Sequence, residues 1–474
     1  MADPPPTESI YQRRRPFRVI VRLSRDIATD AYRDLREAAG RTGLKGLSSV
    51  LEQLDVTGPR LITALDPGRL REIENRRDAD RDQPSLTQYW QIDLTGRDLD
   101  PNEVAAALTG QEGVDVAYVE APAIEAGGPD GRGAAATATA SLNHLDAAPI
   151  GSNVRWAWEK VAGFAADVQV LDVESGWDLS HEALKPLNVS VVSGVNQFGV
   201  NGYSDNHGTA ALGIVAGMFV APQGVEGICS PATVFAASPF NGAAPAQPLA
   251  DVLVAAVTVL HPGDVVLIEV AALEDGVSTR FQRPIERDEH VRQAILLLTG
   301  IGIVVIEPAG NGNKDLAKLG IDNGRCQLDI NGPGFVDSHA VLVGGAFVDP
   351  DAAPGSVARR WVSGDDPRIG SNFGNRVNCY SWARQVYTSG CAPWRSCAAS
   401  AGYQNFNGTS SASAIIAGVA VLVQTMLRAA GRPPLTPDQM RAVLADAGNG
   451  TASEPNSGIG PMPDLERVAA ALGL

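Results

Sequence analysis

A serine, a histidine and a carboxylate occur in this chain where they could form a nucleophilic site. Asp172 ends the apolar run VQVLD, His207 begins the small-residue segment HGTAALGIVAG, and Ser410 lies within NGTSSASAIIAG. A serine hydroxyl is a weak nucleophile until an imidazole takes its proton, and a carboxylate must hold the imidazole's tautomer and stabilise its cation. These residue types predict acyl transfer through Ser410, with His207 as general base and Asp172 as its orienting carboxylate.

An asparagine could complete this site by stabilising negative charge. Asn311 follows the apolar run GIVVIEP within PAGNGN, where glycines allow a tight turn. Gly408 and Thr409 permit a sharp entry into a helix, so Ser410 would lie on the first turn with its backbone N–H pointing outward. That N–H and the Asn311 amide could bind an oxyanion, and removing one such donor costs about 2.7–4 kcal/mol. Taken singly, each residue also has an ordinary structural explanation as a cap or turn residue.

The segments that must position these residues predict an α/β domain over residues 151–474. Near-continuous apolar runs alternate with helical segments such as LADVLVAAVTVL and HVRQAILLLTG, and the runs are DVQVLDV, LNVSVVSG, DVVLIEVA, GIVVIEPAG and AVLVGGAFV. This pattern is typical of a mainly parallel sheet covered by helices on both faces. Reactive groups in such sheets lie beyond the carboxyl ends of the strands, where these candidate residues fall.

The first third of the chain differs from the rest in its pattern of strand-like and helical segments. Residues 17–122 mix the strand-like segments FRVIVRL, TQYWQIDL and VDVAYVEA with helical segments, which predicts a small α+β domain. Residues 1–16 are expected to be a disordered N-terminus. Residues 123–150 are rich in Gly, Ala, Thr and Pro, so we expect a linker there, the kind of segment that proteases cut.

Composition excludes several classes of partner. A formal net charge of −16 argues against a nucleic-acid partner, because binding to phosphates needs a basic surface. We find no secretory leader and no apolar run long enough to span a membrane, so we expect a cytoplasmic protein without a membrane partner. Unconventional export stays open.

The cysteines are odd in number and lack the spacing of metal ligands. We therefore prefer free thiols, and one local disulfide among Cys379, Cys391 and Cys397 stays open.

Several motifs resemble those of the subtilisin-like serine peptidases, the subtilase family. In chain order they are VLDVESGWDLSH, NHGTAALGIVAG, PAGNGN and NGTSSASAIIAG, and SNFGNRVNCY resembles the segment before the serine helix. The resemblance covers about residues 145–470. It implies a serine endopeptidase that acts on peptides or proteins and needs no cofactor for its chemistry. It also implies that residues 17–122 resemble a propeptide, whose last strand lies in the active-site cleft of a zymogen.

The chain departs from the family pattern at three places. The aspartate motif carries two extra residues: strand alternation favours Asp172, whereas counting back without a gap from Gly176 would assign its role to Glu174. Ala414 replaces a proline in the serine motif, and LIEVAAL replaces the Ser-Leu-Gly run that lines the substrate cleft. Subtilases often bind structural calcium, but no acidic loop here identifies a site.

Other functions would use the same residues. A peptide ligase or macrocyclase would resolve the acyl-enzyme with an amine in place of water, using the same triad. A non-catalytic binding protein on the same fold is the third alternative, and the irregular aspartate motif is its main support.

Overall fold

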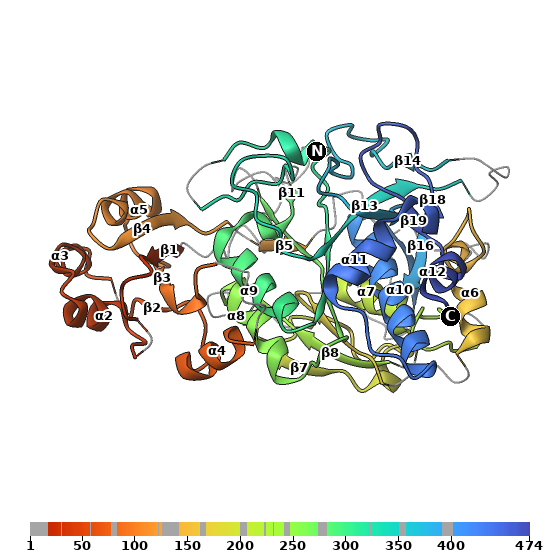
Figure 1. The fold of residues 1–474 in the computed structure, drawn as a ribbon, viewed down its shortest axis with the longest axis horizontal. Helices are drawn as coiled ribbons and strands as arrows, with labels where there is room; N and C mark the ends of the chain where they lie inside the picture. Colours follow the sequence, from red (N-terminus) through yellow and green to blue (C-terminus); the bar gives the residue numbers. More distant parts are fainter. Residues whose placement is uncertain are drawn as a thin grey trace, which may run out of the picture.

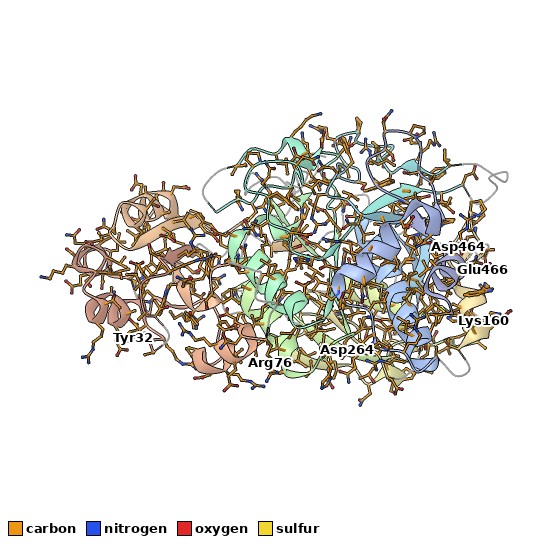
Figure 2. All side chains as sticks on the ribbon, viewed as in Figure 1. Tyr32, Arg76, Lys160, Asp264, Asp464 and Glu466 are labelled. Carbon is orange, nitrogen blue, oxygen red and sulfur yellow. The ribbon has the colours of Figure 1, made fainter. Side chains whose placement is uncertain are left out.

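The computed structural model describes residues 18–29, 31–56, 58–76, 83–121, 123–125, 142–161, 167–199, 206–221, 224–230, 232–240, 247–273, 282–321, 324–349, 357–390 and 402–474. Within them an N-terminal unit, residues 18–121, lies beside a larger α/β body along the long axis of the molecule (Figure 1). Tyr32 in the N-terminal unit and Glu466 near the C-terminus lie toward opposite ends of this axis (Figure 2).

The N-terminal unit is built on a four-stranded antiparallel sheet. Its strands pair in the order β2-β3-β1-β4 and comprise β1 Arg18–Leu23, β2 Arg60–Leu61, β3 Tyr89–Asp93 and β4 Val114–Val119. Its helices are α2 Leu35–Thr42, α3 Lys45–Gln53, α4 Pro67–Glu74 and α5 Pro101–Thr109, with the 3₁₀ turn η1 Leu86–Gln88. Asp34, Asp66 and Asp100 cap helices α2, α4 and α5, because their carboxylates accept hydrogen bonds from N–H groups of the first turn.

An eight-stranded, mainly parallel sheet forms the centre of the larger body, as the sequence predicted. The strands follow the order β14-β13-β12-β9-β6-β8-β7, and β15 also pairs with β13. They comprise β6 Gln169–Val173, β7 Ser190–Ser193, β8 Thr233–Ala237, β9 Val265–Ile268, β12 Val304–Pro308, β13 Val341–Phe347, β14 Arg359–Arg360 and β15 Cys379–Trp382. Strand β14 runs antiparallel to β13, and the other pairs are parallel.

Helices cover both faces of this sheet. Helices α7 His207–Ala216 and α10 Thr409–Ala429 pack on one face, and α8 Leu249–Val254, its 3₁₀ continuation η5 Ala255–Thr258, and α9 Glu289–Gly300 pack on the other. Alternation along β9 separates the two cores: Val265 and Leu267 face α7 and α10, whereas Val266 and Ile268 face α8 and α9. On the neighbouring strand β6, Val170 lies opposite Val265 and Asp172 lies opposite Leu267. The side chains of Val170 and Asp172 therefore also point toward helices α7 and α10.

Helix α10 is long and apolar enough, by length and average composition, to cross a membrane. Polar residues such as Ser413 and Gln424 interrupt it, so it contains no uninterrupted apolar run of 18 residues. Its apolar window is completely buried inside the body, between the sheet and helices α6 and α7. A helix that is apolar on all sides suits the centre of a large protein core as well as a membrane.

One face of the N-terminal sheet packs on the larger body. On β1, Val19 and Val21 pack with helices α2, α3 and α5. The side chain of Ile20 points the opposite way and joins the apolar cluster that contains α8 and α9. Two side chains of the N-terminal unit also bond to these helices: Thr63 Oγ1 donates to Asp251 Oδ1 at 3.0 Å, and Arg22 pairs with Glu289.

A short strand, β5 Ala123–Glu125, continues from the N-terminal unit into the larger body (Figure 1). It pairs antiparallel with β10 Val270–Leu273, with Val270 opposite Glu125 and Ala272 opposite Ala123. Strand β11 Gln282–Arg283 pairs with the other edge of β10. Residues 123–125 lie at the start of the segment that the sequence predicts to be a linker. In the structure these three residues form a paired strand instead.

The remaining elements complete the body. They are α6 Val154–Lys160, β16 Val386–Ser389, β17 Tyr403–Phe406, α11 Pro437–Ala445, β18 Gly450–Thr451, β19 Met462–Pro463 and α12 Leu465–Leu472, with the 3₁₀ turns η2 Asn143–Leu145, η3 Lys185–Leu187, η6 Ile285–Arg287, η7 Leu316–Lys318 and η8 Ala447–Asn449. Cys379 is a buried free thiol. The expected disordered N-terminus, most of the expected linker, Cys391 and Cys397 lie outside the described residues.

Candidate active site

Helices α7 and α10 bring His207 and Ser410 together. His207 is the first residue of α7, and Ser410 is the second residue of α10. Gly408 precedes that helix with a φ of 96°, a conformation that favours glycine and allows the sharp entry. The Nε2 atom of His207 lies 3.1 Å from Ser410 Oγ, within reach for proton transfer. The structure thus brings together the two residues that the sequence analysis pairs.

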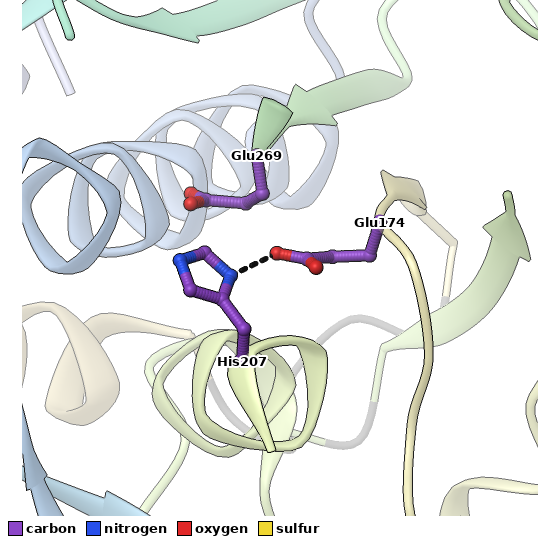
Figure 3. Close-up of side chains that lie close together, drawn as sticks. All are labelled: Glu174, His207 and Glu269. Atoms are coloured by element: carbon purple, nitrogen blue, oxygen red, sulfur yellow. Dashed lines mark hydrogen bonds and ion pairs between the residues drawn. The ribbon is translucent and has the colours of Figure 1, made fainter. Parts of the chain in front are cut away.

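Glu174, and not Asp172, contacts the other nitrogen of His207. The Oε1 atom of Glu174 forms a hydrogen bond with Nδ1 of His207 (Figure 3). Asp172 Oδ2 instead accepts a 2.7 Å hydrogen bond from Nε1 of Trp177. The preference for Asp172 as the carboxylate on His207 is therefore wrong in this geometry, and the alternative residue, Glu174, occupies that place.

The physical reason lies at the end of strand β6. Asp172 and Glu174 are two residues apart, so alternation directs both side chains to the same face and cannot choose between them. Asp172 is inside the strand, where it pairs opposite Ala236 and Leu267, whereas Glu174 is the first residue beyond its carboxyl end. Burial raises the pKa of Asp172 to about 7, although the hydrogen bond from Trp177 lowers it in part.

Asn311 is anchored against the residue that precedes Ser410. Its Oδ1 atom accepts hydrogen bonds of 2.9 Å from both the backbone N–H and the hydroxyl of Thr409. These hydrogen bonds fix the orientation of the Asn311 amide plane. Because Oδ1 accepts both of them, the NH₂ group is the part of the amide that can donate to another acceptor. The structure thus places Asn311 beside the start of α10, where sequence reasoning expected it.

A third carboxyl group, Glu269, lies at the same place, and sequence reasoning did not identify it. Glu269 follows β9, and its Oε1 accepts a 2.7 Å hydrogen bond from the hydroxyl of Ser413 on α10. Figure 3 shows Glu269 and Glu174 directed toward the His207 ring from different sides. The available signal was a glutamate within the apolar run LIEVAAL, because an ionisable residue in a buried strand is rare without a specific role or partner.

These groups are enclosed in the full-length chain. Ser410, Glu174 and Glu269 are 0% exposed, and His207 is 1% exposed. The ring of Phe406 packs edge-on against the His207 imidazole, with ring centroids 4.9 Å apart. Low water access strengthens electrostatic interactions among these residues and makes any uncompensated charge there costly.

Two groups of His, Asp and Glu side chains in the described part of the chain are close enough to share a metal ion. They are Glu174, His207 and Glu269, and Asp337, His339 and Asp438. In the first group, Glu174 already engages His207. In the second group, the guanidinium of Arg441 forms an ion pair with the carboxylate of Asp337, and its Nη2 donates a 2.7 Å hydrogen bond to Oδ2. Because these contacts already use ligand atoms of both groups, we assign no calcium site.

Comparison with known families accounts for this arrangement. A model of the subtilase family matches residues 167–460, the part of the chain that contains the sheet, His207, Asn311 and Ser410. The chain therefore belongs to the subtilase family of serine proteases, as its motifs suggested. Membership of this family implies a peptide or protein substrate.

A search of solved structures finds several matches at low sequence identity. Fervidolysin from Fervidobacterium pennivorans, a keratinolytic enzyme related to subtilisin, is 12% identical with a TM-score of 0.57, and the match covers 96% of this chain and 61% of that chain. The prenylagaramide maturation protease PagA is 15% identical (TM-score 0.46, 67% of this chain and 98% of that chain). The PatG macrocyclase in complex with peptide is 14% identical (TM-score 0.47, 68% and 95%). A search of curated proteins finds no match.

Proposed function

We propose that the chain is a serine endopeptidase that cleaves peptide bonds through an acyl-enzyme on Ser410. The Oγ atom of Ser410 attacks the carbonyl carbon while Nε2 of His207 takes its proton, and the same proton then passes to the leaving amine. Glu174 holds Nδ1 of His207 and stabilises the imidazolium that forms. Asn311 and the backbone N–H of Ser410 donate to the oxyanion. Water then attacks the ester and releases Ser410.

The continuous contact from Glu174 through His207 to Ser410 is the observation that supports this proposal. Nδ1 of His207 meets Glu174 while Nε2 faces Ser410 at 3.1 Å, so the ring has its orienting carboxylate and its nucleophile on opposite nitrogens. Asn311 joins the group through Thr409. A binding protein that had lost catalysis would have no need to keep these contacts together.

Labelling with a fluorophosphonate probe tests the nucleophile. Wild-type protein should be labelled covalently, and Ser410→Ala should not. Ser411→Ala is the matched control, because Ser411 lies on the same helix turn but directs its hydroxyl to the carbonyls of Trp382 and Gly408. Equal labelling of wild type and Ser410→Ala would refute the assignment. Mass spectrometry of peptide products separates hydrolysis, which adds water, from ligation, which does not.

We also propose that the chain is made as a zymogen whose N-terminal unit blocks the substrate cleft. Strand β5 pairs antiparallel with β10, as an extended peptide substrate adds to a sheet edge. In this register Glu125 lies opposite Val270, the neighbour in sequence of Glu269. Strand β5 thus ends beside the segment that carries Glu269, and we expect self-cleavage within a few residues after Glu125.

Intact-mass measurements over time test this second proposal. Wild-type chain should lose a fragment that ends shortly after residue 125, and Ser410→Ala should stay intact under the same conditions. If the wild type also stays intact while its Ser410 reacts with the fluorophosphonate, the zymogen proposal fails and the peptidase proposal survives.

A further inference from the structure

We propose that Glu269 is a positioning residue of the proposed peptidase that must carry its proton for Ser410 to react. The ionised form would switch the site off on the alkaline side. This inference rests on the proposed function, and it concerns a residue of LIEVAAL, the segment that stands in place of the Ser-Leu-Gly run of the substrate cleft.

The position of Glu269 follows from strand alternation. It has the same parity as Val265 and Leu267, whose side chains face α7 and α10, so its own side chain is directed at the start of α10. There Oε1 accepts the hydrogen bond from Ser413, one turn beyond Ser410. Glu269 is completely buried. It therefore belongs to the interior of the site, and its place in the chain directly precedes the strand that pairs with β5.

The charged groups that face Glu269 are mainly acidic. Asp172 and Glu174 lie on β6 and just beyond it, and α7 contributes His207, which Glu174 already engages. Helix α10 contributes the hydroxyls of Ser410 and Ser413. Arg283 on the neighbouring β11 is directed to Asp288, and Glu307 on β12 accepts from the backbone of Glu286. Within the described residues, no lysine or arginine forms an ion pair with Glu269.

Such surroundings favour the neutral acid. Burial raises the pKa of Glu269 well above its usual range, and the negative charge of Glu174 raises it further. Hydrogen bonds from Ser413 and Ser410 oppose this rise only in part. A carboxyl group placed beside another carboxylate without its own cation is expected to hold its proton at neutral pH.

The protonation state of Glu269 decides where the proton of Ser410 points. An ionised Glu269 accepts hydrogen bonds only, so it would compete with Nε2 of His207 for the Ser410 hydroxyl. It would also attract the imidazolium form of His207 and repel the oxyanion of the tetrahedral intermediate. A protonated Glu269 can itself donate toward Ser410, which leaves the serine proton directed at His207. The reaction would therefore require the neutral form of Glu269.

The variant that tests this is Glu269→Gln, which keeps an acceptor for Ser413 but cannot ionise. We would measure the second-order rate of fluorophosphonate labelling at Ser410 between pH 5 and pH 10, using full chain that has been allowed to process itself. In the wild type the rate should fall at alkaline pH. In Glu269→Gln the ratio of the rates at pH 9 and pH 6 should be at least about tenfold higher than in the wild type, which is a shift of one or more pH units in the alkaline limb. An unchanged ratio overturns the proposal.

A second measurement reads the proton directly and needs no activity. Full-length Ser410→Ala protein and its Glu269→Gln counterpart are compared at pH 7 by infrared difference spectroscopy. Asp172 can contribute a protonated-acid band to both proteins at this pH, so the difference between the two spectra is what isolates Glu269. That difference should contain the carbonyl band of one buried protonated carboxylic acid in the first protein. Absence of the band from the difference overturns the proposal even where the peptidase assignment holds. Absence of Ser410 labelling at every pH, with the band present, instead refutes the proposed function.

Discussion

The carboxylate of Glu174 contacts Nδ1 of His207 from the first position beyond the end of strand β6. Asp172, two residues earlier, is held by the indole N–H of Trp177 at 2.7 Å. Both side chains lie on the same face of the strand, but only the residue past its carboxyl end meets the imidazole. This relationship assigns the two acids different tasks, which substitution can separate.

Replacing each acid by its amide should give very different rates. Glu174→Gln should lower kcat by roughly 10⁴-fold, the loss seen when the triad acid of a serine protease becomes an amide, because the wrong imidazole tautomer is then stabilised. Asp172→Asn should lower kcat by less than about tenfold, since an asparagine oxygen still accepts from Trp177. Steady-state kinetics on one peptide substrate, with active sites counted by titration, measures both. The reverse ranking would restore Asp172 as the triad acid.

Asp172 should nevertheless control how stability changes with pH. Its folded-state pKa is raised to about 7 by burial, above an unfolded value of about 3.9. The folded state therefore binds this proton more tightly, and the contribution of Asp172 to stability is lost as pH rises through about 7. Asp172→Asn cannot ionise, so it should gain stability relative to the wild type between pH 4 and pH 8, by an amount on the order of a few kcal/mol. Urea unfolding in a Ser410→Ala background measures this difference. A difference that does not vary with pH would contradict the raised pKa.

Removing the side-chain amide of Asn311 should affect the transition state more than substrate binding. Asn311→Ala is expected to lower kcat by roughly 10²–10³-fold with little change in KM, because the oxyanion exists only after attack. Asn313 provides a matched control in the same PAGNGN turn. Its side chain donates to the carbonyl of Pro367 at 2.7 Å, and its φ of 48° is tolerated by glycine, so Asn313→Gly should keep kcat near the wild-type value. An equal loss in both variants would indicate a disturbed turn and not a lost oxyanion donor.

The sequence carried the information for the sheet and for most of the site. Apolar runs such as GIVVIEP fixed the parallel strands, and Ser410 and His207 each lie at the start of a helix that packs on them. The pattern could not choose between Asp172 and Glu174, because residues two apart share a face and the end of the strand was not visible from alternation.

Two further features depend on contacts between distant segments. Strand β5 lies in a Gly-rich segment and is defined by its pairing with β10, about 150 residues later, so local composition predicted a linker. Glu269 was visible as a lone glutamate among apolar residues. Its position in the active site could not be predicted from the sequence, because the hydroxyl that it contacts, on Ser413 of helix α10, lies far away in the chain.

At the junction between the N-terminal unit and the larger body, Glu120 forms a buried ion pair with Arg18 of its own unit and contacts His290 of the body, so removing its charge should loosen this junction. Glu120 pairs with Arg18, and its Oε1 lies 3.2 Å from Nε2 of His290 on α9. Burial alone would raise the pKa of Glu120, but the charge of Arg18 and the bond to His290 hold it below its usual range. We therefore expect Glu120 to be ionised at neutral pH, and the stabilising effect of the pair should fade as pH falls below about 4.3.

Glu120→Gln removes the negative charge and leaves the cation of Arg18 in a buried setting. Breaking a buried pair in this way costs about 3–5 kcal/mol, whereas Glu72→Gln, in the exposed Arg69–Glu72 pair, should cost less than about 0.5 kcal/mol. In a Ser410→Ala background, amide hydrogen exchange at pH 7 should show faster exchange in β5 and β4 for Glu120→Gln than for Glu72→Gln, because undocking exposes these strands. In chains that keep Ser410, the same loosening should weaken the proposed inhibition by the N-terminal unit and raise the rate of peptide cleavage before the proposed processing is complete. If the two variants exchange and cleave alike, the charge of Glu120 and its contact with His290 do not hold the N-terminal unit on the body.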